Sequence, residues 1–440
     1  PKVVLSRDAR LSSFSLSKSA ARGLAAGGGR VVDCGLSTTP MHYFIVNREK
    51  TDGGLMITAS HNPGQYNGIK LSRHGAISLS ETAGLQEIKK MVVEGDHSGR
   101  SPVESRSSST GRSEAPYNHP SGGAIRGEGS RGKKSPVVKK NYLSQYINFL
   151  AGFAGPKIKK LKIAVDAGSG MAGLILPRLL KKLKIKYAGL CLKPDGRFPY
   201  HEADPMNEET LFGLQKLMRK EKYDLGLAFD GDGDRVAFLD ETGKVIFASF
   251  ILALAAREFL KINRGAAVVY DFRSSRIVPE TVIEAGGRPV WTRVGHSFVK
   301  EKIRAEKAVF GGELSGHYFF KDFFYADSAL MMMIKVLNIL AASDKKISEL
   351  ISPFQKYWHS GEINFRLKND KKKEEKLKLL ARNYKDGKIS WPDGLLAEFP
   401  DFWFSVRPSN TEPLLRFVLE AEAKEIMEQK VKEISDILKR

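Results

Sequence analysis

Apolar and polar positions along the chain repeat one pattern three times. In each copy, a strand of β-branched and other apolar residues ends at an aspartate, and a small polar loop, a helix and a second strand follow. The copies begin at KVVLSRDARLSS, KIAVDAGSGMAG and AAVVYDFRSSRI, and their aspartates are Asp8, Asp166 and Asp271. Such recurrence is typical of repeated βαβ units. It predicts three similar α/β domains with mixed sheets, whose ligand-binding loops follow the strands.

The pattern changes from about Tyr357 onward. The runs GEINFRL, GLLAEFP, DFWFSVRPS and LLRFVLEAE have the character of strands, and Lys/Glu-rich helices flank them. We therefore expect a smaller C-terminal α+β domain. The predicted domains span residues 1–154, 155–244, 245–356 and 357–440.

Residues 96–136 interrupt the first domain. About half of them are Ser, Gly or Pro, and Val103 and Ile125 are almost the only aliphatic residues larger than alanine. A segment of this composition buries too little apolar surface to fold. We expect a disordered insert.

Length and composition narrow the class of protein. A chain of 440 residues exceeds what one core usually supports, and its most apolar stretch, SALMMMIKVLNILAA, is interrupted by Lys335 and Asn338. We therefore expect several domains and no membrane span. Cys34 and Cys191 are far apart and form no CxxC pair, which argues against a disulfide or zinc framework and fits a reducing cytoplasm.

The net charge of +21 attracts anions, and both nucleic acids and sugar phosphates qualify. Much of the excess lies in solvated runs such as KNDKKKEEKLK, and no RNP or zinc-finger pattern accompanies it. We expect no specific nucleic-acid binding.

The stretch YDLGLAFDGDGDRVAFLD carries the strongest chemical signal. Asp230, Asp232 and Asp234 follow a strand, are spaced by glycines and precede Arg235. Three carboxylates this close repel one another unless a cation holds them, and oxygen ligands suit Mg²⁺. With Glu241 the spacing matches a calcium loop, but Arg235 occupies the position that needs glycine, and strands rather than helices flank it. A solvated acidic turn is the other alternative.

The stretch TASHNP places Ser60 beside His61. Ser60 is a hydrolase nucleophile, a phosphate carrier or only a loop hydroxyl, and neighbours in sequence rarely face each other as a triad requires. The charge balance around the three aspartates favours Ser60 as a phosphate carrier. Three aspartates with Mg²⁺ leave about −1, a phosphoserine adds about −2, and Lys70 with Arg235 brings the sum back to about −1.

Two further loops have weaker signals. GGELSGHYFF offers Glu313 and Ser315 to the hydroxyls of a sugar, although Gly-rich turns are common. RPSNTEP offers a phosphate the side chains of Arg407, Ser409, Asn410 and Thr411, or it is an ordinary Asx or Ser turn. His296 lies on a loop after a strand and is a further candidate, whereas we read His317 as a structural residue.

The four motifs, in this order, resemble those of the α-D-phosphohexomutases, most closely the bacterial and archaeal phosphomannomutase/phosphoglucomutase branch. The resemblance covers the whole chain except residues 96–136. It implies four domains around a central cleft, each supplying one loop. It also implies that phosphorylated Ser60 passes its phosphoryl group to a hexose 1- or 6-phosphate through a bound hexose 1,6-bisphosphate, which also serves as activator. No water takes part.

The resemblance also assigns roles to residues. Ser60 as its phosphate, Asp230, Asp232 and Asp234 hold Mg²⁺. His61 and Arg235 support the phosphoryl group, and Lys70 is the general acid/base. Substrate contacts fall to Arg273, His296, Glu313, Ser315, Arg407, Ser409, Asn410 and Thr411.

The chain departs from this family in three places. Members usually begin some tens of residues earlier, with a Tyr and Arg-Gly segment, so we expect the first domain to be incomplete as given. Residues 96–136 replace a short connection. Arg273 stands where relatives commonly carry a lysine.

Three functions remain open on this basis. The first is a mannose/glucose phosphomutase, and the apolar Leu314 favours it over the second, a glucosamine phosphomutase, whose members tend to carry a polar residue there. The third is a sugar-phosphate-binding protein without turnover. In each case the ligand is a sugar phosphate, and we expect a cytoplasmic monomer or weak dimer.

Overall fold

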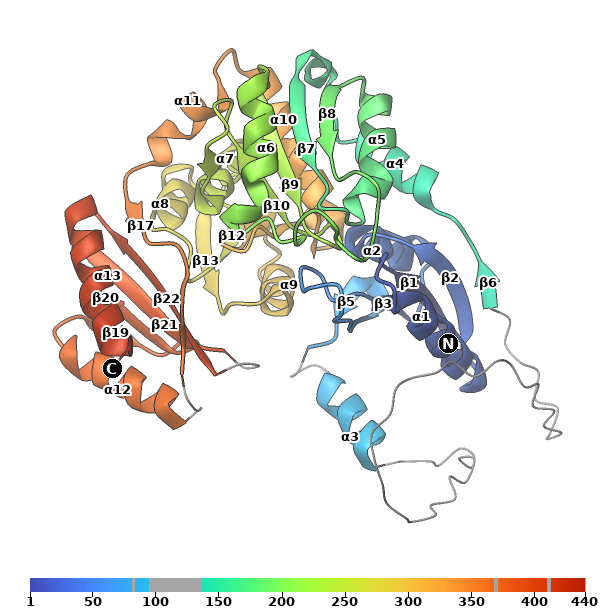
Figure 1. The fold of residues 1–440 in the computed structure, drawn as a ribbon, viewed down its shortest axis with the longest axis horizontal. Helices are drawn as coiled ribbons and strands as arrows, with labels where there is room; N and C mark the ends of the chain where they lie inside the picture. Colours follow the sequence, from blue (N-terminus) through green and yellow to red (C-terminus); the bar gives the residue numbers. More distant parts are fainter. Residues whose placement is uncertain (81–83, 95–136, 368–370, 410–412, 440) are drawn as a thin grey trace.

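The computed structural model describes residues 1–80, 84–94, 137–367, 371–409 and 413–439. Figure 1 shows four sheets arranged along an arc, with the first domain at one end and the C-terminal domain at the other. The segment predicted to be a disordered insert, residues 96–136, lies outside the described residues. The predicted domain boundaries remain predictions.

The first sheet has the strand order β5-β4-β3-β1-β2-β6. Its strands are β1 (Lys2–Arg7), β2 (Arg30–Leu36), β3 (Gly53–Ile57), β4 (Ile69–Arg73), β5 (Ile77–Ser78) and β6 (Val137–Lys139). The helices in this part of the chain are α1 (Ser13–Ala26), α2 (Thr39–Arg48), α3 (Gln86–Glu94) and α4 (Leu143–Ala151).

The second sheet has the order β11-β10-β9-β7-β8. It comprises β7 (Lys162–Asp166), β8 (Lys186–Leu190), β9 (Leu225–Phe229), β10 (Val236–Leu239) and β11 (Val245–Ile246), with helices α5 (Ala172–Leu183) and α6 (Phe212–Lys220).

The third sheet has the order β13-β12-β14-β15-β16. Its strands are β12 (Ala267–Asp271), β13 (Arg288–Thr292), β14 (Phe310–Gly312), β15 (Tyr318–Phe320) and β16 (Ala326–Asp327). Its helices are α7 (Ala248–Ile262), α8 (Ile277–Glu284), α9 (His296–Ala305), α10 (Ala329–Ala342) and α11 (Ile347–Ile351). Short 3₁₀ helices along the chain are η1 (His74–Ala76), η3 (Pro156–Lys160), η4 (Glu208–Leu211), η5 (Lys321–Phe323) and η6 (Ser352–Phe354).

These three sheets repeat one topology. In each, a central strand (β1, β7 or β12) pairs in parallel with a strand on either side, and an antiparallel strand extends the sheet. An aspartate at the end of each central strand, or directly after it in the case of β1, accepts the backbone N–H two residues later, at 3.0 Å for Asp8, 2.8 Å for Asp166 and 2.9 Å for Asp271. An Asx turn of this kind starts the loop that follows the strand. The prediction of three similar α/β domains with mixed sheets is confirmed.

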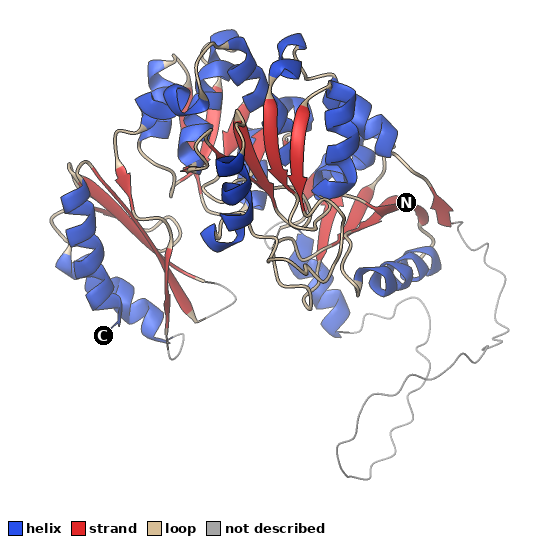
Figure 2. Cartoon of the chain, turned by 45° about the horizontal axis from the view of Figure 1, so that its top comes forward, coloured by secondary structure: helices blue, strands red, loops and turns tan. Residues whose placement is uncertain are grey.

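The last sheet is antiparallel throughout its described pairings. It contains β17 (Trp358–His359), β18 (Ile363–Arg366), β19 (Lys388–Ser390), β20 (Leu395–Glu398), β21 (Phe402–Pro408) and β22 (Leu414–Ala421). Figure 2 shows its helices α12 (Lys371–Asn383) and α13 (Lys424–Lys439) on one face of the sheet. The prediction of a C-terminal α+β domain is confirmed.

A large apolar core is shared by the first three domains, which also contain smaller apolar clusters, and the C-terminal domain has a core of its own. The apolar stretch SALMMMIKVLNILAA forms α10, whose residues from Leu330 to Ile334 are fully buried in the shared core. Across the ranges that the structure describes, no helix combines the length and the apolar character needed to cross a membrane.

Candidate functional site

Ser60 lies in the loop that follows β3, and its backbone adopts the left-handed conformation with φ 52°. Non-glycine residues rarely take this conformation, because it costs of order 1 kcal/mol or more, and such residues are common at functional sites. The Ser60 N–H donates to Thr58 Oγ1 at 3.0 Å, and its side chain is almost buried, at 9% exposure of the residue. The loop therefore presents the Ser60 hydroxyl in one fixed direction.

That direction leads to the acidic loop after β9. Ser60 Oγ donates to Asp230 Oδ2 at 2.9 Å, across 170 positions of sequence. The two backbones also touch, because a Cβ added to Gly231 would lie 2.4 Å from the Ser60 carbonyl oxygen. Only glycine permits so close an approach. The structure thus brings together the Ser60 and Asp230 motifs that the sequence paired by charge alone.

The three carboxylates are fully buried. Asp230 Oδ1 accepts the N–H groups of Gly233, Asp234 and Arg235 at 2.9, 3.0 and 3.1 Å, which fixes the curl of the loop. Burial and the neighbouring carboxylates raise the pKa of Asp230 well above its usual value. Burial would raise the pKa of Asp234 too, but Lys70 and His317 outweigh it and hold that pKa well below its usual value.

Lys70, on β4, reaches the same carboxylates. Its Nζ lies 2.7 Å from Asp232 Oδ2 and 2.7 Å from Asp234 Oδ2, and its side chain is 19% exposed. Burial disfavours the ammonium, but the two aspartates more than offset this and raise the pKa of Lys70 well above its usual value. Lys70 therefore enters any reaction in its protonated form.

The donor set fits a hard divalent cation. The loop supplies three carboxylates within 4.8 Å of one another, and Asp232 Oδ1 is buried without a hydrogen bond from any described residue. A buried carboxylate oxygen without a partner is costly, and a cation would satisfy it. Oxygen-only ligands of this kind match Mg²⁺.

His61 and Arg235 lie beside this cluster. Burial, together with the nearby Arg235, lowers the pKa of His61 to about 4, so this imidazole is neutral at pH 7. Arg235 Nε lies 3.8 Å from Asp230 Oδ2. A neutral His61 can donate one hydrogen bond to a phosphoryl oxygen but adds no charge, so Arg235 is the cationic partner of the pair.

Sequence reasoning missed Arg10, which holds the Ser60 loop in place. Its Nε pairs with Asp8 Oδ2 at 3.0 Å, and both side chains are buried. Its two Nη atoms donate to four loop carbonyls at 2.6–3.1 Å, those of Ser60, Asn62, Pro63 and Tyr66. A signal existed, because Asp-x-Arg follows the central strand in both the first and third repeats, at Asp8 and at Asp271.

The GGELSGH loop joins the acidic loop directly. Arg235 and His317 form an antiparallel β-bridge, and the Val236 N–H donates to the Gly316 carbonyl at 3.1 Å. Glu313 is buried and accepts the Gly295 N–H at 2.9 Å, and Ser315 Oγ lies 3.3 Å from Glu313 Oε2. The loop that the sequence assigned to sugar hydroxyls therefore lies against the carboxylate cluster.

His317, which the sequence left as a structural residue, stands at this junction. Its Nε2 faces Asp234 Oδ1 at 3.3 Å and its Nδ1 faces Glu313 Oε2 at 3.1 Å. Burial disfavours the imidazolium, but the two carboxylates outweigh it and raise the pKa of His317 to about 9. His317 Nε2 also lies 3.3 Å from Arg235 Nε. A hydrogen bond between these two atoms would require Nε2 to be unprotonated. Because the ring lies between two carboxylates, the protonated form is favoured instead.

We predict that His317→Gln destabilises the protein in a pH-dependent way. Because the folded pKa of about 9 exceeds the ordinary 6.5, the stabilisation is complete below pH 6.5 and is lost as pH rises through 9. The free energy of unfolding should fall by on the order of 2–3 kcal/mol below pH 6.5 and by less above pH 9. Urea unfolding of both proteins at several pH values measures this difference in the free energy of unfolding. The exposed His74→Gln is the control, and a loss independent of pH would contradict the assignment.

His296 begins α9, and its ring centroid lies 6.0 Å from that of His317. Burial, with Lys300 nearby, lowers the pKa of His296 well below its usual value, and its Nδ1 is buried without a hydrogen bond from the described residues. His296 is therefore a neutral group beside the sugar loop, with one ring nitrogen available to a ligand.

Arginines gather where the third and fourth domains meet. Glu362 accepts from Arg273 Nη1 at 2.9 Å and from Arg416 Nη1 at 3.2 Å, and Arg407 Nη2 lies 3.8 Å away. Arg273 also pairs with Asp271 at 2.7 Å. Three guanidinium groups around one carboxylate form an anion-binding arrangement, since arginine matches both carboxylate and phosphate oxygens. Sequence reasoning named Arg273 and Arg407 and missed Glu362 and Arg416, which carry no motif.

The predicted phosphate-binding loop RPSNTEP is only partly described. Ser409 is buried, and its carbonyl accepts Lys373 Nζ at 2.7 Å. Asn410 and Thr411 lie outside the described residues.

The chain matches four family models in succession. They are Phosphoglucomutase/phosphomannomutase alpha/beta/alpha domain I over residues 1–98, domain II over 141–243, domain III over 248–357, and the C-terminal domain over 362–437.

Individual proteins are also similar over nearly the whole chain. A protein named phosphohexose mutases from Xanthomonas campestris is 35% identical over 441 residues, covering 99% of this chain and 91% of its own. A phosphomannomutase from Methanocaldococcus jannaschii is 36% identical over 404 residues, covering 92% of this chain and 82% of its own. The crystal structure of a phosphoglucomutase/phosphomannomutase family protein from Burkholderia thailandensis has a TM-score of 0.81 at 30% identity, with 99% and 88% covered.

Proposed function

The chain belongs to the phosphoglucomutase/phosphomannomutase family and is a phosphohexomutase, and from this premise we propose that Ser60 carries the phosphoryl group between positions 1 and 6 of mannose and glucose phosphates. The resemblance inferred from the four motifs is confirmed. The observation that carries the proposal is the 2.9 Å contact between Ser60 Oγ and Asp230 Oδ2. It places the one strained serine of the TASHNP loop against the acidic loop.

We propose that Asp230, Asp232 and Asp234, with the phosphate on Ser60, hold Mg²⁺. When bound, this cation neutralises negative charge on the phosphoryl oxygens, which is the main requirement of phosphoryl transfer. Arg235 and the neutral His61 lie where they can contact the same oxygens.

Proton movement falls to Lys70 in this scheme. Transfer breaks the bond between Ser60 Oγ and phosphorus and forms a bond between phosphorus and a sugar hydroxyl oxygen. Lys70, protonated at the start, gives its proton to the leaving Ser60 Oγ and recovers one from the attacking hydroxyl. Its position on the same carboxylates as Ser60 supports this role.

Substrate binding is divided between two regions. Glu313 and Ser315, with His296 beside them, offer acceptors and donors to sugar hydroxyls. Arg273 and Arg407 offer guanidinium groups to the phosphate that is not being transferred, with Ser409, Asn410 and Thr411 as its further contacts. We propose that this phosphate replaces Glu362 as the partner of the arginines. Because the bisphosphate must turn over between the two transfers, the same groups serve both orientations, and hexose 1,6-bisphosphate acts as activator.

Chelation is predicted to abolish turnover reversibly. Three buried carboxylates should bind Mg²⁺ only in the folded state, so ion at 100 times its dissociation constant stabilises the protein by about 2.7 kcal/mol. Mutase assays in EDTA and then in excess Mg²⁺ test the reversible loss of turnover. Thermal unfolding with and without Mg²⁺ tests the stabilisation by the ion. Asp232→Asn should show neither turnover that depends on Mg²⁺ nor stabilisation by Mg²⁺. Asp240→Asn, whose carboxylate lies outside the cluster, should show both. Full activity in EDTA would refute the metal assignment.

The mannose/glucose function fits better than the amino-sugar alternative, because relatives such as the one from Methanocaldococcus jannaschii are named phosphomannomutase. Comparing kcat/KM for mannose 1-phosphate, glucose 1-phosphate and glucosamine 1-phosphate tests this choice. Intact-mass analysis should find a gain of about 80 Da at Ser60, the mass of one phosphoryl group. Preference for glucosamine 1-phosphate would overturn the substrate assignment, and conversion without any phosphoserine would overturn the mechanism.

A further inference from the structure

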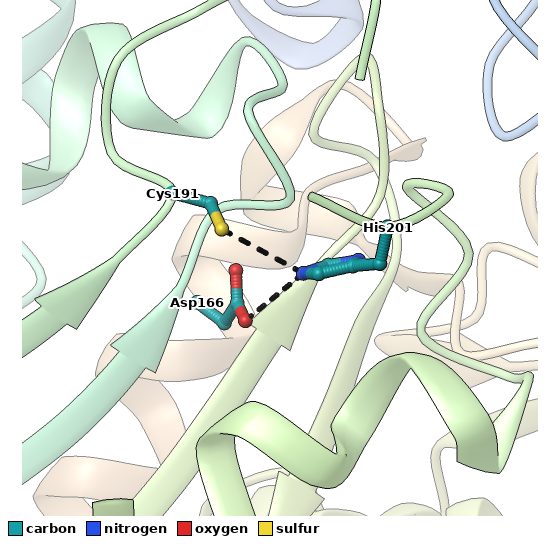
Figure 3. A group of neighbouring side chains, drawn as sticks. All are labelled: Asp166, Cys191 and His201. Atoms are coloured by element: carbon teal, nitrogen blue, oxygen red, sulfur yellow. Dashed lines mark hydrogen bonds and ion pairs between the residues drawn. The ribbon is translucent and has the colours of Figure 1, made fainter. Parts of the chain in front are cut away.

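A second group of potential metal ligands lies in the second domain, apart from the acidic loop. Figure 3 shows Asp166, Cys191 and His201 directed toward one another. Asp166 ends β7, Cys191 directly follows β8, and His201 comes from the long connection after it. One ligand atom from each lies within 4.8 Å of the other two.

Two of the three distances between ligand atoms match those of a tetrahedral metal site. His201 Nε2 lies 3.7 Å from Cys191 Sγ and 3.2 Å from Asp166 Oδ2. Ligands bound to Zn²⁺ at the usual bond lengths and tetrahedral angles lie about 3.6 Å apart for nitrogen and sulfur and about 3.4 Å for nitrogen and oxygen. The side chains would need little movement to bind an ion.

The orientation of His201 also fits. Its Nδ1 lies 2.8 Å from the carbonyl oxygen of Glu202, to which it donates, and this directs Nε2 at Asp166 and Cys191. Histidine ligands almost always donate their other ring N–H to a carbonyl or carboxylate, which fixes the tautomer. Asp166 is buried, while the His201 side chain is 24% exposed, so an ion has both an anchored ligand and access from solvent.

We propose that Asp166, Cys191 and His201 bind a borderline-soft divalent cation of the Zn²⁺ class, with a fourth position left for water. Mixed sulfur, nitrogen and oxygen ligands select such ions over Mg²⁺, whereas the all-oxygen Asp230 loop has the opposite preference. On binding, the ion replaces the proton on Nε2 and the proton on Sγ, and both protons pass to solvent. One cysteine with a histidine and an aspartate leaves no CxxC signature, so the sequence pointed away from zinc.

The site lies at the base of a segment that supports the Ser60 loop. Between Cys191 and His201, the Phe198 ring stacks on the Arg10 guanidinium at 5.0 Å, and a Cβ on Gly64 would lie 2.7 Å from the Gly196 carbonyl oxygen. The Cys191 carbonyl accepts the Ser169 N–H at 2.9 Å, and the Met171 N–H donates to Gly231 in the acidic loop at 2.9 Å. A bound ion would fix both ends of this segment and so stiffen the contact between the first two domains.

The alternative is a metal-free ion pair. The hydrogen bond that His201 donates to Asp166, together with its contact with Cys191, raises the pKa of His201 to about 10, so a protonated His201 can hold the same arrangement. Titration of the full chain with Co²⁺ distinguishes the metal site from the metal-free ion pair. Excess Mg²⁺ is present to fill the acidic loop. Only a bound thiolate gives Co²⁺ a sulfur-to-metal charge-transfer band in the near ultraviolet.

The expected result is a band that saturates at one ion per chain. Cys191→Ser should abolish it, and His201→Gln should weaken binding by more than about tenfold. Cys34→Ser is the matched control and should retain the band, because burial beside Asp33 raises the pKa of Cys34 to about 12 and disfavours its thiolate. No band in the unmodified chain, or a band that persists in Cys191→Ser, would overturn the proposal.

Discussion

Replacing Ser60 with alanine is expected to abolish mutase turnover while leaving the fold intact. In the proposed mechanism the Ser60 hydroxyl carries the phosphate, and no neighbouring group in the described structure can take its place against Asp230 Oδ2. Loss of a nucleophile commonly lowers kcat by a factor of about 10⁴ or more. Stability should change by only about 1 kcal/mol, because Ser60 Oγ makes a single hydrogen bond.

The measurement is glucose 1-phosphate conversion at saturating Mg²⁺ and 1,6-bisphosphate, with intact mass on the same sample. Ser72→Ala is the matched control, since Ser72 is a buried serine of β4 whose Oγ donates to the Gly54 carbonyl at 3.4 Å. It should keep both phosphorylation and activity. Substantial turnover by Ser60→Ala would end the carrier assignment, whatever the fate of the metal site.

Arg10→Met is expected to damage both stability and activity. It removes five hydrogen bonds, four to loop carbonyls and one to Asp8, and leaves the buried Asp8 carboxylate without its cation. Breaking a buried ion pair on one side costs about 3–5 kcal/mol. If the Ser60 loop shifts by even about 1 Å, kcat should fall by about 10²-fold, because phosphoryl transfer depends on alignment.

Arg10→Lys keeps this prediction testable if Arg10→Met does not fold. Lysine preserves the charge beside Asp8 but cannot reach four carbonyls at once. It should restore most of the stability and little of kcat. Arg22→Met, on the exposed face of α1, is the control and should behave as the unmodified protein. Full activity in Arg10→Lys would show that Arg10 acts only through charge and not by shaping the Ser60 loop.

The candidate site was predictable where its chemically active residues lie close together in the sequence. Three aspartates separated by glycines imply a cation, and the charge that this cation leaves unbalanced pointed to Ser60 and Lys70. The structure places Ser60 Oγ 2.9 Å from Asp230 and Lys70 Nζ 2.7 Å from Asp232, in agreement with that balance. Local charge arithmetic succeeded because a buried acidic loop must be neutralised by whatever lies nearby.

Reasoning from local sequence failed for residues whose role depends on neighbours from another domain. His317 is one histidine in a Gly-rich turn until the β-bridge to Arg235 sets it between Asp234 and Glu313. Glu362 likewise gains meaning only when the third domain brings Arg273 to it, beside Arg416 of its own domain. No periodicity or spacing encodes a contact between elements so far apart in sequence.

The sequence by itself determined the repeated α/β pattern and the α+β character of the final domain, and it singled out the candidate loops for phosphate, metal and sugar, because strand periodicity and clustered charge are local properties. The tertiary structure alone decided which loops meet, which imidazoles are neutral and which are charged, and that Arg10 holds the serine loop. Those outcomes depend on burial and on distances between chain segments, which set both hydrogen-bond partners and pKa values. The same dependence on distance brings Asp166, Cys191 and His201 together.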